Sequence, residues 1–368
     1  MRENTWFADG RHARDGVRRR SAGLRVLRCL GLLVLASLAA TIPAEAQFTC
    51  QLYVPTHKSN SVAVIDVWTG QLVTVVPVQV QPLAVAMTPN GAFAYVTNSG
   101  WIFGSDSVSV IDTASYSVVA TIPVGHYPVG IAITPDGAFA YVANFNSNTV
   151  SVIDTATRTV VTTVPLAYGS GPWGLAITPD GTSVYVTDVN TSDVSVIKTA
   201  TNSLVGTVPV GSKPGAVAIT PNGAFAYVAN SGADSVSVIS TASNAVVATV
   251  PVVSGSYNSG PYAIAVSWDG GSAYVANSAA STVSVIDTAT NQVTANIAVG
   301  STPHGVVLDG VFAYVTNEIS NTVSVIDTRT KTVVATIEGV ALLPEGIAMK
   351  WPAGTKPPGA SPCRSLGG

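Results

Sequence analysis

The stretch that decides the fold runs from Gly130 to Val164 and reads GIAITPDGAFAYVANFNSNTVSVIDTATRTVVTTV. It contains four short runs rich in Val, Ile, Thr and Tyr, at 130–134, 139–143, 150–153 and 159–164. β-Branched and aromatic residues with a period near two indicate antiparallel strands. Turn residues separate the runs, and in Pro135-Asp136-Gly137 the glycine can adopt the positive φ of a tight turn. The stretch therefore predicts one four-stranded antiparallel unit without helix.

The same unit recurs along most of the chain. A Tyr-Val dipeptide returns every 40 to 47 residues, at Tyr53, Tyr95, Tyr141, Tyr185, Tyr227, Tyr274 and Tyr314. A period of this length, filled with short strands, is typical of the blades of a β-propeller. The sequence therefore predicts an all-β, seven-bladed β-propeller of four-stranded antiparallel blades.

Short motifs within the repeats resemble a known family. Tyr-Val-Thr-Asn stands at 95–98 and 314–317, Ser-Val-Ile-Asp-Thr at 151–155 and 284–288, and Pro-Asp-Gly at 135–137 and 179–181. These motifs resemble the YVTN-repeat β-propellers of bacteria and archaea over residues 50 to 351. The resemblance implies a seven-bladed propeller that is exported or lies on the cell surface. Function does not follow from such a fold.

The ends of the repeat array predict how the ring closes. We name the strands of a blade A to D from the central channel outward. The N-terminal residues match strands B, C and D (51–55, 61–66 and 72–76), whereas the strand A segment 344–350 stands alone at the C-terminal end. The first blade is thus expected to combine both ends of the chain, which pairs edges that an open ring would expose. Cys50 and Cys363 flank this seam, and we expect them either to form a disulfide or to stay as free thiols at flexible ends.

The first 46 residues are predicted to be a signal peptide with a polar N-terminal extension. A basic segment that includes Arg18, Arg19 and Arg20 precedes the apolar run Leu30–Ala40, and Ala44-Glu45-Ala46 is a small-x-small cleavage site. A retained N-terminal anchor is the alternative. The predicted domains are the leader (1–46), the propeller (47–351) and a C-terminal tail (352–368), and we expect export to the periplasm, cell envelope or medium.

Charge limits the class of partner. The whole chain has a formal net charge of −3, and without the leader nine basic and 16 acidic residues remain, a net charge of −7. No basic patch is left to neutralise phosphates, so nucleic acid is not expected as a partner. No apolar run of the mature chain is long enough for a membrane helix. We expect a monomer.

Two polar positions recur in nearly every blade and predict structural roles. Strand C ends in Asp at 66, 112, 154, 287 and 327, where the carboxylate can accept backbone N–H groups of the next turn. Strand B is followed by Asn at 98, 144, 230, 277 and 317, with Asp188 in the fourth blade. We expect these Asn residues to cap the strand in the left-handed conformation.

The blades differ at one position that should surround the channel mouth. The second residue of strand A is Leu83, Val129, Trp173, Gly215, Tyr262, His304 and Glu345 in turn. The last three come from consecutive blades, so a phenol, an imidazole and a carboxylate should lie side by side, facing Trp173 across the opening. A carboxylate can orient a neighbouring imidazole and raise its basicity, which is the minimum for general acid–base catalysis. His304, Glu345 and Tyr262 are therefore the candidate catalytic residues, with a solvated polar rim as the alternative interpretation.

Further candidates lie in the loops on the same face. His57, His126, Tyr127 and Lys213 are candidates for ligand or partner binding, as are Trp173 and the aromatic residues Trp101 and Phe103 of the long loop 98–106. Exposed aromatic side chains on a rigid scaffold are typical of contact surfaces, although Trp101 and Phe103 could instead fold over the channel. No histidine spacing or cysteine cluster suggests a metal, and no cofactor is expected.

Two functions remain at this stage. The first is a non-catalytic binding scaffold that contacts a protein, glycan or small molecule through its top face. The second is an enzyme at the channel mouth, a lyase or lactone hydrolase, in which His304 acts as acid/base and Glu345 orients it. The segments Pro303-His304-Gly305 and Pro344-Glu345-Gly346 are similar to those of streptogramin lyases, which place His and Glu at the channel mouth.

Overall fold

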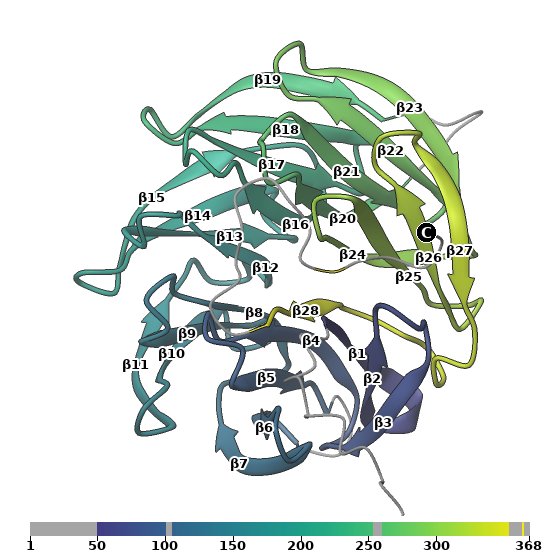
Figure 1. Ribbon diagram of the computed structural model, residues 1–368. Helices are drawn as coiled ribbons and strands as arrows, with labels where there is room; N and C mark the ends of the chain where they lie inside the picture. Colours follow the sequence, from purple (N-terminus) through teal and green to yellow (C-terminus); the bar gives the residue numbers. More distant parts are fainter. Residues whose placement is uncertain (1–49, 101–104, 253–259, 353–362, 364–368) are drawn as a thin grey trace, which may run out of the picture. The chain divides into compact units, whose positions relative to one another are not determined.

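The computed structural model describes residues 50–100, 105–252, 260–352 and 363. These residues form seven four-stranded antiparallel sheets, one for each predicted blade. Figure 1 labels the strands. The only helix among the described residues is the 3-10 turn η1 (His57–Ser59). The all-β, seven-bladed prediction is confirmed.

The first blade combines the two ends of the described chain, as predicted. Its strand order is β28-β1-β2-β3, and β1 pairs on one side with β2 and on the other with β28. The C-terminal strand A is shorter than expected, although Pro344 forms an isolated bridge with Thr56 ahead of it. The strands of this blade are β28 (Ala348–Lys350), β1 (Gln51–Thr56), β2 (Ser61–Asp66) and β3 (Leu72–Pro77).

The other six blades are continuous in sequence. Blades 2 to 4 consist of β4 (Pro82–Met87), β5 (Phe93–Asn98), β6 (Ser107–Asp112), β7 (Ser117–Pro123), β8 (Pro128–Ile133), β9 (Phe139–Asn144), β10 (Thr149–Asp154), β11 (Thr159–Pro165), β12 (Pro172–Ile177), β13 (Ser183–Asp188), β14 (Asp193–Lys198) and β15 (Ser203–Pro209). Blades 5 to 7 consist of β16 (Pro214–Ile219), β17 (Phe225–Asn230), β18 (Ser235–Ser240), β19 (Ala245–Pro251), β20 (Pro261–Val266), β21 (Ser272–Asn277), β22 (Thr282–Asp287), β23 (Gln292–Ala298), β24 (Pro303–Leu308), β25 (Phe312–Asn317), β26 (Thr322–Asp327) and β27 (Thr332–Ile337).

The core lies between neighbouring blades. Strands B and C are almost entirely buried, whereas strand D is mostly exposed and has one buried residue near its end. The strand A of each blade contacts that of the next from β4 to β24, and β28 contacts β4. A cluster of buried residues joins the seventh blade to the first, with Tyr314 and Val325 packed near Leu52 and Met349. Burial against both neighbours explains the nearly continuous apolar sequence of strands B.

The repeated tyrosine links successive blades. All seven Tyr side chains are among the largest fully buried residues. Tyr141 donates its hydroxyl hydrogen to Asn202 at 2.6 Å, and Tyr185 donates to Asn244 at 2.6 Å, in each case in the C–D turn of the next blade. A buried phenol favours such a partner, and Tyr227 donates to Asn291 at 2.9 Å in the same way.

The threonine of Tyr-Val-Thr-Asn also contacts the next blade. Thr97 donates to the carbonyl oxygen of Val129 at 2.7 Å, and Thr316 donates to that of Glu345 at 2.6 Å. The accepting residue is in both cases the second residue of the next strand A segment. The motif therefore positions the side chains that surround the channel mouth.

The expectation for the Asn position is wrong. These residues end strand B within the sheet, they are fully buried, and none has a positive φ. Their side-chain amides donate instead to Ser or Thr of strand C, as Asn144 does to Ser151 at 2.9 Å. Because burial of an amide without hydrogen-bond partners is costly, the side chain bonds to strand C and does not cap the turn. The prediction for strand C was correct, since Asp154, for example, accepts the backbone N–H of Thr157 at 2.7 Å.

The structure contains a disulfide between Cys50 and Cys363. Their Cα atoms are 5.6 Å apart, and the two residues are separated by 313 positions in the sequence. Both cysteines are buried, in the cluster that joins the seventh blade to the first. The disulfide therefore fastens the seam of the ring.

Candidate functional site

The site is formed where the D–A and B–C loops of the blades meet, which we call the upper mouth of the channel. Tyr262 and His304 occupy the second position of β20 and β24, and Glu345 lies three residues before the start of β28. The seam of the ring passes through this site, because His57 belongs to the N-terminal part of the first blade and Glu345 to its C-terminal part.

Glu345 lies between two imidazoles. Its Oε2 is 3.0 Å from Nδ1 of His304, and its Oε1 is 3.3 Å from Nδ1 of His57. The Glu345 side chain is only 6% exposed, against 17% for His304 and 27% for His57. The distances are those of charge-assisted hydrogen bonds or close ion pairs.

The backbone of Glu345 is fixed as firmly as its side chain. Its N–H donates to the carbonyl oxygen of Pro55 at 3.0 Å, and its carbonyl oxygen accepts from Thr316. Thr316 also accepts the backbone N–H of Gly305 at 2.8 Å, next to His304. One hydroxyl therefore holds the two chain segments that carry His304 and Glu345.

Electrostatics favour the ionised pair. Burial by itself would raise the pKa of Glu345, but the imidazoles of His304 and His57 outweigh it and lower the pKa to about 2. Burial would likewise lower the pKa of His304, yet the Glu345 carboxylate and, more weakly, Glu318 raise it. Opposite charges at this separation stabilise both ionised forms. His304 thus keeps its proton to a higher pH than a free histidine.

An aromatic row continues from this pair around the mouth. Ring centroids are 4.0 Å apart between Tyr262 and His304, 6.1 Å between Trp173 and Tyr262, 5.6 Å between Phe145 and Trp173, and 5.7 Å between Tyr127 and Phe145. The Trp173, Phe145 and Tyr127 contacts are edge-to-face, the arrangement that aromatic pairs prefer. Burial raises the pKa of Tyr262 far above its ordinary value, so the phenol stays neutral.

The position of Trp173 differs from the expectation. We expected it across the opening from Tyr262, but the two rings are in contact. The strand between them carries Gly215, and a Cβ there would lie 2.8 Å from the carbonyl oxygen of Tyr262. Because glycine leaves this space free, the side chains of the fourth and sixth blades meet over the fifth.

Of the remaining candidates, His126 and Lys213 have hydrogen-bond partners other than Glu345. His126 is about half exposed and its Nδ1 lies 2.7 Å from Asp106, while the carbonyl oxygen of Lys213 accepts a hydrogen bond from Ser231. Tyr127 belongs to the aromatic row. Trp101 and Phe103 lie outside the described residues, so the structure does not test them.

Two residues of the site were missed by the sequence analysis. Phe145 links Tyr127 to Trp173, and Glu318 acts on the pKa of His304. Both follow the last residue of strand B, the repeat position that His57 occupies in the first blade. In the other blades this position holds Ser99, Val189, Ser231 and Ser278. Comparison of the blades at this position would have found Phe145 and Glu318 together with His57.

The described residues contain no group of three or more His, Cys, Asp or Glu side chains arranged to hold a metal ion. Within the described part of the chain, no helix is long and apolar enough to cross a membrane.

Comparison with solved structures places the fold among known propellers. The chain is 30% identical to a chain of hydrazine synthase from Kuenenia stuttgartiensis, with a TM-score of 0.68, over 76% of this chain and 92% of that one. A functionally unknown protein from Desulfotomaculum acetoxidans is 20% identical, with a TM-score of 0.70, over 82% and 99%. Dihydro-heme d1 dehydrogenase NirN is 18% identical, with a TM-score of 0.60, over 78% and 63%. At these last two identities the likeness concerns the fold alone.

No curated protein sequence matches the chain. A family model described as lactonase, seven-bladed β-propeller, matches residues 47–163 and 154–298. These segments cover most of the blades whose repeats and strands are described above. The chain therefore belongs to the lactonase family of seven-bladed β-propellers.

Proposed function

We propose that the chain is an exported binding protein that recognises a small polar, ring-shaped ligand, such as a sugar or a sugar lactone, at its upper mouth. The observation that carries the proposal is the His57–Glu345–His304 cluster beside the aromatic row. The cluster offers charged hydrogen-bonding groups, and Tyr262 and Trp173 offer ring faces and edges. Such a combination binds compact ligands that have both polar and apolar surfaces.

The arrangement favours recognition over turnover. Each oxygen of Glu345 has an imidazole as partner, and the Tyr262 ring packs against the His304 ring at a tilt of 43°. These contacts hold the groups of the site in place before a ligand arrives, and such preorganisation lowers the entropic cost of binding.

Export is part of the same proposal. The sequence of residues 1–46 supports a cleaved leader, and the disulfide between Cys50 and Cys363 supports an oxidising compartment such as the periplasm. The Tyr-Val-Thr-Asn repeats support a place in the YVTN-repeat group of exported propellers. N-terminal sequencing of the protein recovered from cells tests this: a start at Gln47 supports export, and an intact Met1 contradicts it.

Lactone hydrolysis is the second candidate. The name of the family supports it, together with the 3.0 Å contact between His304 and Glu345. In such a reaction water adds to the lactone carbonyl and the ring C–O bond breaks. Protonated His304 gives its proton to the leaving ring oxygen, and the proton lost by the water returns to His304. Glu345 would orient the imidazole throughout.

One experiment separates the two candidates. The mature protein is titrated calorimetrically with neutral monosaccharides and with γ- and δ-lactones, and acid release is followed in parallel. Saturable binding that His304→Ala weakens at least tenfold, without acid release above the rate in buffer, supports the binding protein. Acid release that His304→Ala abolishes supports the hydrolase. If no compound of the panel binds or reacts, both candidates fail. His126→Ala is the matched control, because this imidazole pairs with Asp106 away from the cluster.

A further inference from the structure

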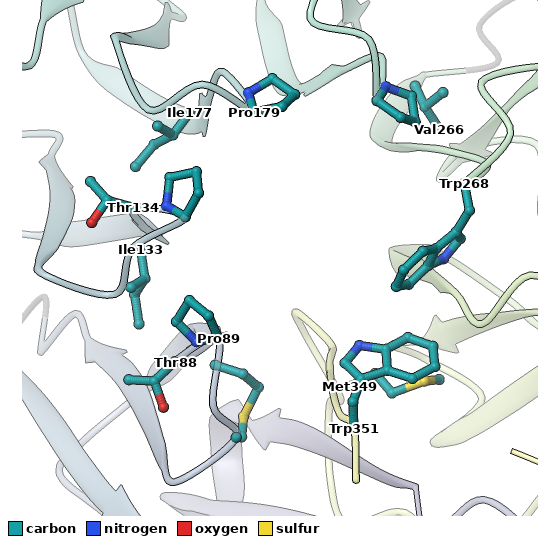
Figure 2. A pocket seen from close by; sticks show the side chains of 14 residues that line it. Thr88, Pro89, Ile133, Thr134, Ile177, Pro179, Val266, Trp268, Met349 and Trp351 are labelled. Atoms are coloured by element: carbon teal, nitrogen blue, oxygen red, sulfur yellow. The ribbon is translucent and has the colours of Figure 1, made fainter. Parts of the chain in front are cut away.

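The channel has a second mouth, formed by the A–B turns at the opposite end of the strands A. A cavity of about 540 Å³ opens there, and the second residues of these turns line it: Pro89, Pro135, Pro179, Pro221, Trp268 and Trp351. Met87, Ile133, Ile177, Val266 and Met349 form its wall deeper in the channel. Figure 2 shows the labelled side chains arranged around an open space. We call this the lower mouth.

Two blades depart from the repeat at this end. Where four blades carry proline in the A–B turn, the sixth carries Trp268 and the first carries Trp351. The blade between them has a shorter turn, in which Asp309 pairs with Phe312, whereas Thr220 pairs with Phe225 in the fifth blade. The seventh blade therefore has no residue at the proline position. The two indoles meet there edge-to-face with their centroids 4.9 Å apart, and both line the cavity (Figure 2).

The lining carries no charge, and its exposed surface is divided almost evenly between apolar and polar atoms. None of the lining side chains is ionisable. The hydroxyls of Thr88 and Thr134 donate to Asn90 and Asp136, and Nε1 of Trp268 donates to the carbonyl oxygen of Leu308 at 3.1 Å. A charged ligand would lose hydration there without an ionic partner among the lining side chains. An apolar ligand would release water from the wall and contact it closely.

We propose that the lower mouth is a binding site for a small, uncharged, planar aromatic molecule. The cavity volume lies in the range of small-molecule sites. The indoles of Trp268 and Trp351 offer an aromatic wall, and the thioethers of Met87 and Met349 offer polarisable contacts that adapt to a flat ring. This site is distinct from the upper mouth and does not depend on the function proposed for it.

The test uses the neutral fluorescent probe N-phenyl-1-naphthylamine with the mature protein. We expect one saturable site, with an increase and blue shift of probe emission and a fall in tryptophan emission through energy transfer to the bound probe. Pro179→Glu places a charge at the mouth, and we expect it to raise the dissociation constant of the probe at least tenfold. Pro135→Trp fills the cavity without charge, and we expect a similar loss. Both substitutions are at exposed turn positions where Trp268 shows that a residue other than proline is accepted.

Two control variants make the outcome decisive. Pro209→Glu introduces the same charge at the exposed end of β15, and Trp173→Ala removes the largest ring of the upper mouth. Both are expected to bind the probe as the wild type does. The proposal is overturned if binding does not saturate or if Pro179→Glu and Pro135→Trp bind like the wild type. It is equally overturned if Trp173→Ala removes the binding, because the probe then occupies the upper mouth.

Discussion

Replacement of Glu345 by Gln is the perturbation whose consequences can be worked out furthest. The substitution keeps the size of the side chain and removes the charge that both imidazoles contact. The pKa of Glu345 is lowered from 4.5 to about 2. A shift of this size corresponds to roughly 3 kcal/mol of stability from the ionised carboxylate. The side chain is nearly buried, so solvent screening reduces this value little.

The pH dependence has a definite sign. The folded pKa of Glu345 is depressed, so its contribution is complete above the unfolded pKa near 4.5 and is lost as the pH falls toward 2. The folded pKa of His304 is raised, so its contribution is complete below the unfolded pKa near 6.5 and is lost as the pH rises through the folded pKa. The free energy of unfolding of the wild type should therefore exceed that of Glu345→Gln most between pH 4.5 and 6.5, by about 3 kcal/mol. The difference should shrink on either side of this window.

Two assays measure these effects. Urea unfolding from pH 3 to 9 gives the stability difference, and NMR titration of the histidine side chains gives the pKa of His304. In Glu345→Gln this pKa should fall below 6.5, because burial remains while the carboxylate is gone. Glu338→Gln, at an exposed position after β27, is the matched control. A difference that does not vary with pH, or a His304 pKa that is unchanged in Glu345→Gln, would refute the reasoning.

Three further predictions concern other parts of the molecule. Burial raises the pKa of Asp188 to about 7, so the wild type loses stability as the pH rises from about 4 to 7. Asp188→Asn introduces the residue that five other blades carry, and it should be more stable than the wild type by up to about 4 kcal/mol at pH 8 and by much less at pH 4. An equal gain in stability at both pH values in urea unfolding would contradict this. Loss of the disulfide in the Cys50→Ser, Cys363→Ser double variant should destabilise the protein by roughly 5 kcal/mol on the chain-entropy model, and an unchanged urea midpoint would show that the seam does not need it. Thr316→Val should lower the affinity for any upper-mouth ligand and displace the His304 resonance while the far-ultraviolet circular dichroism is retained, since one hydroxyl holds both chain segments; an unaltered His304 resonance would show that this hydroxyl does not position the site.

The architecture could be predicted from the sequence because the same strand and turn pattern occurs seven times. The period of Tyr-Val, the turn residues and the unpaired strand A segment at 344–350 together predicted the blades and the composite first blade. The neighbourhood of His304 and Glu345 also followed, because the second residue of each strand A has the same place in every blade. Each of these features is found by comparing equivalent positions of the seven repeats, and a single sequence is enough for that comparison.

What the sequence could not predict depends on contacts between different repeat positions. The amide of Asn144 is buried against strand C, although its place after a strand suggested a cap. Trp173 reaches Tyr262 only because Gly215 leaves room, and the indoles of Trp268 and Trp351 meet only because the turn between them is short. The last two arrangements combine residues from two or three blades, and the first combines two strands of one blade. Packing, rather than local preference, decides where such side chains point.

The most direct test of the upper mouth as a binding site uses the three histidines of the propeller as reporters. NMR spectra of the mature, histidine-labelled protein are recorded during titration with the sugar or lactone that binds most tightly in calorimetry. We predict that the His57 and His304 signals move together and saturate at one equivalent, whereas the signal of His126, which pairs with Asp106, stays in place. Saturable binding that leaves His57 and His304 unmoved, or that moves His126 as much as the other two, would contradict the account.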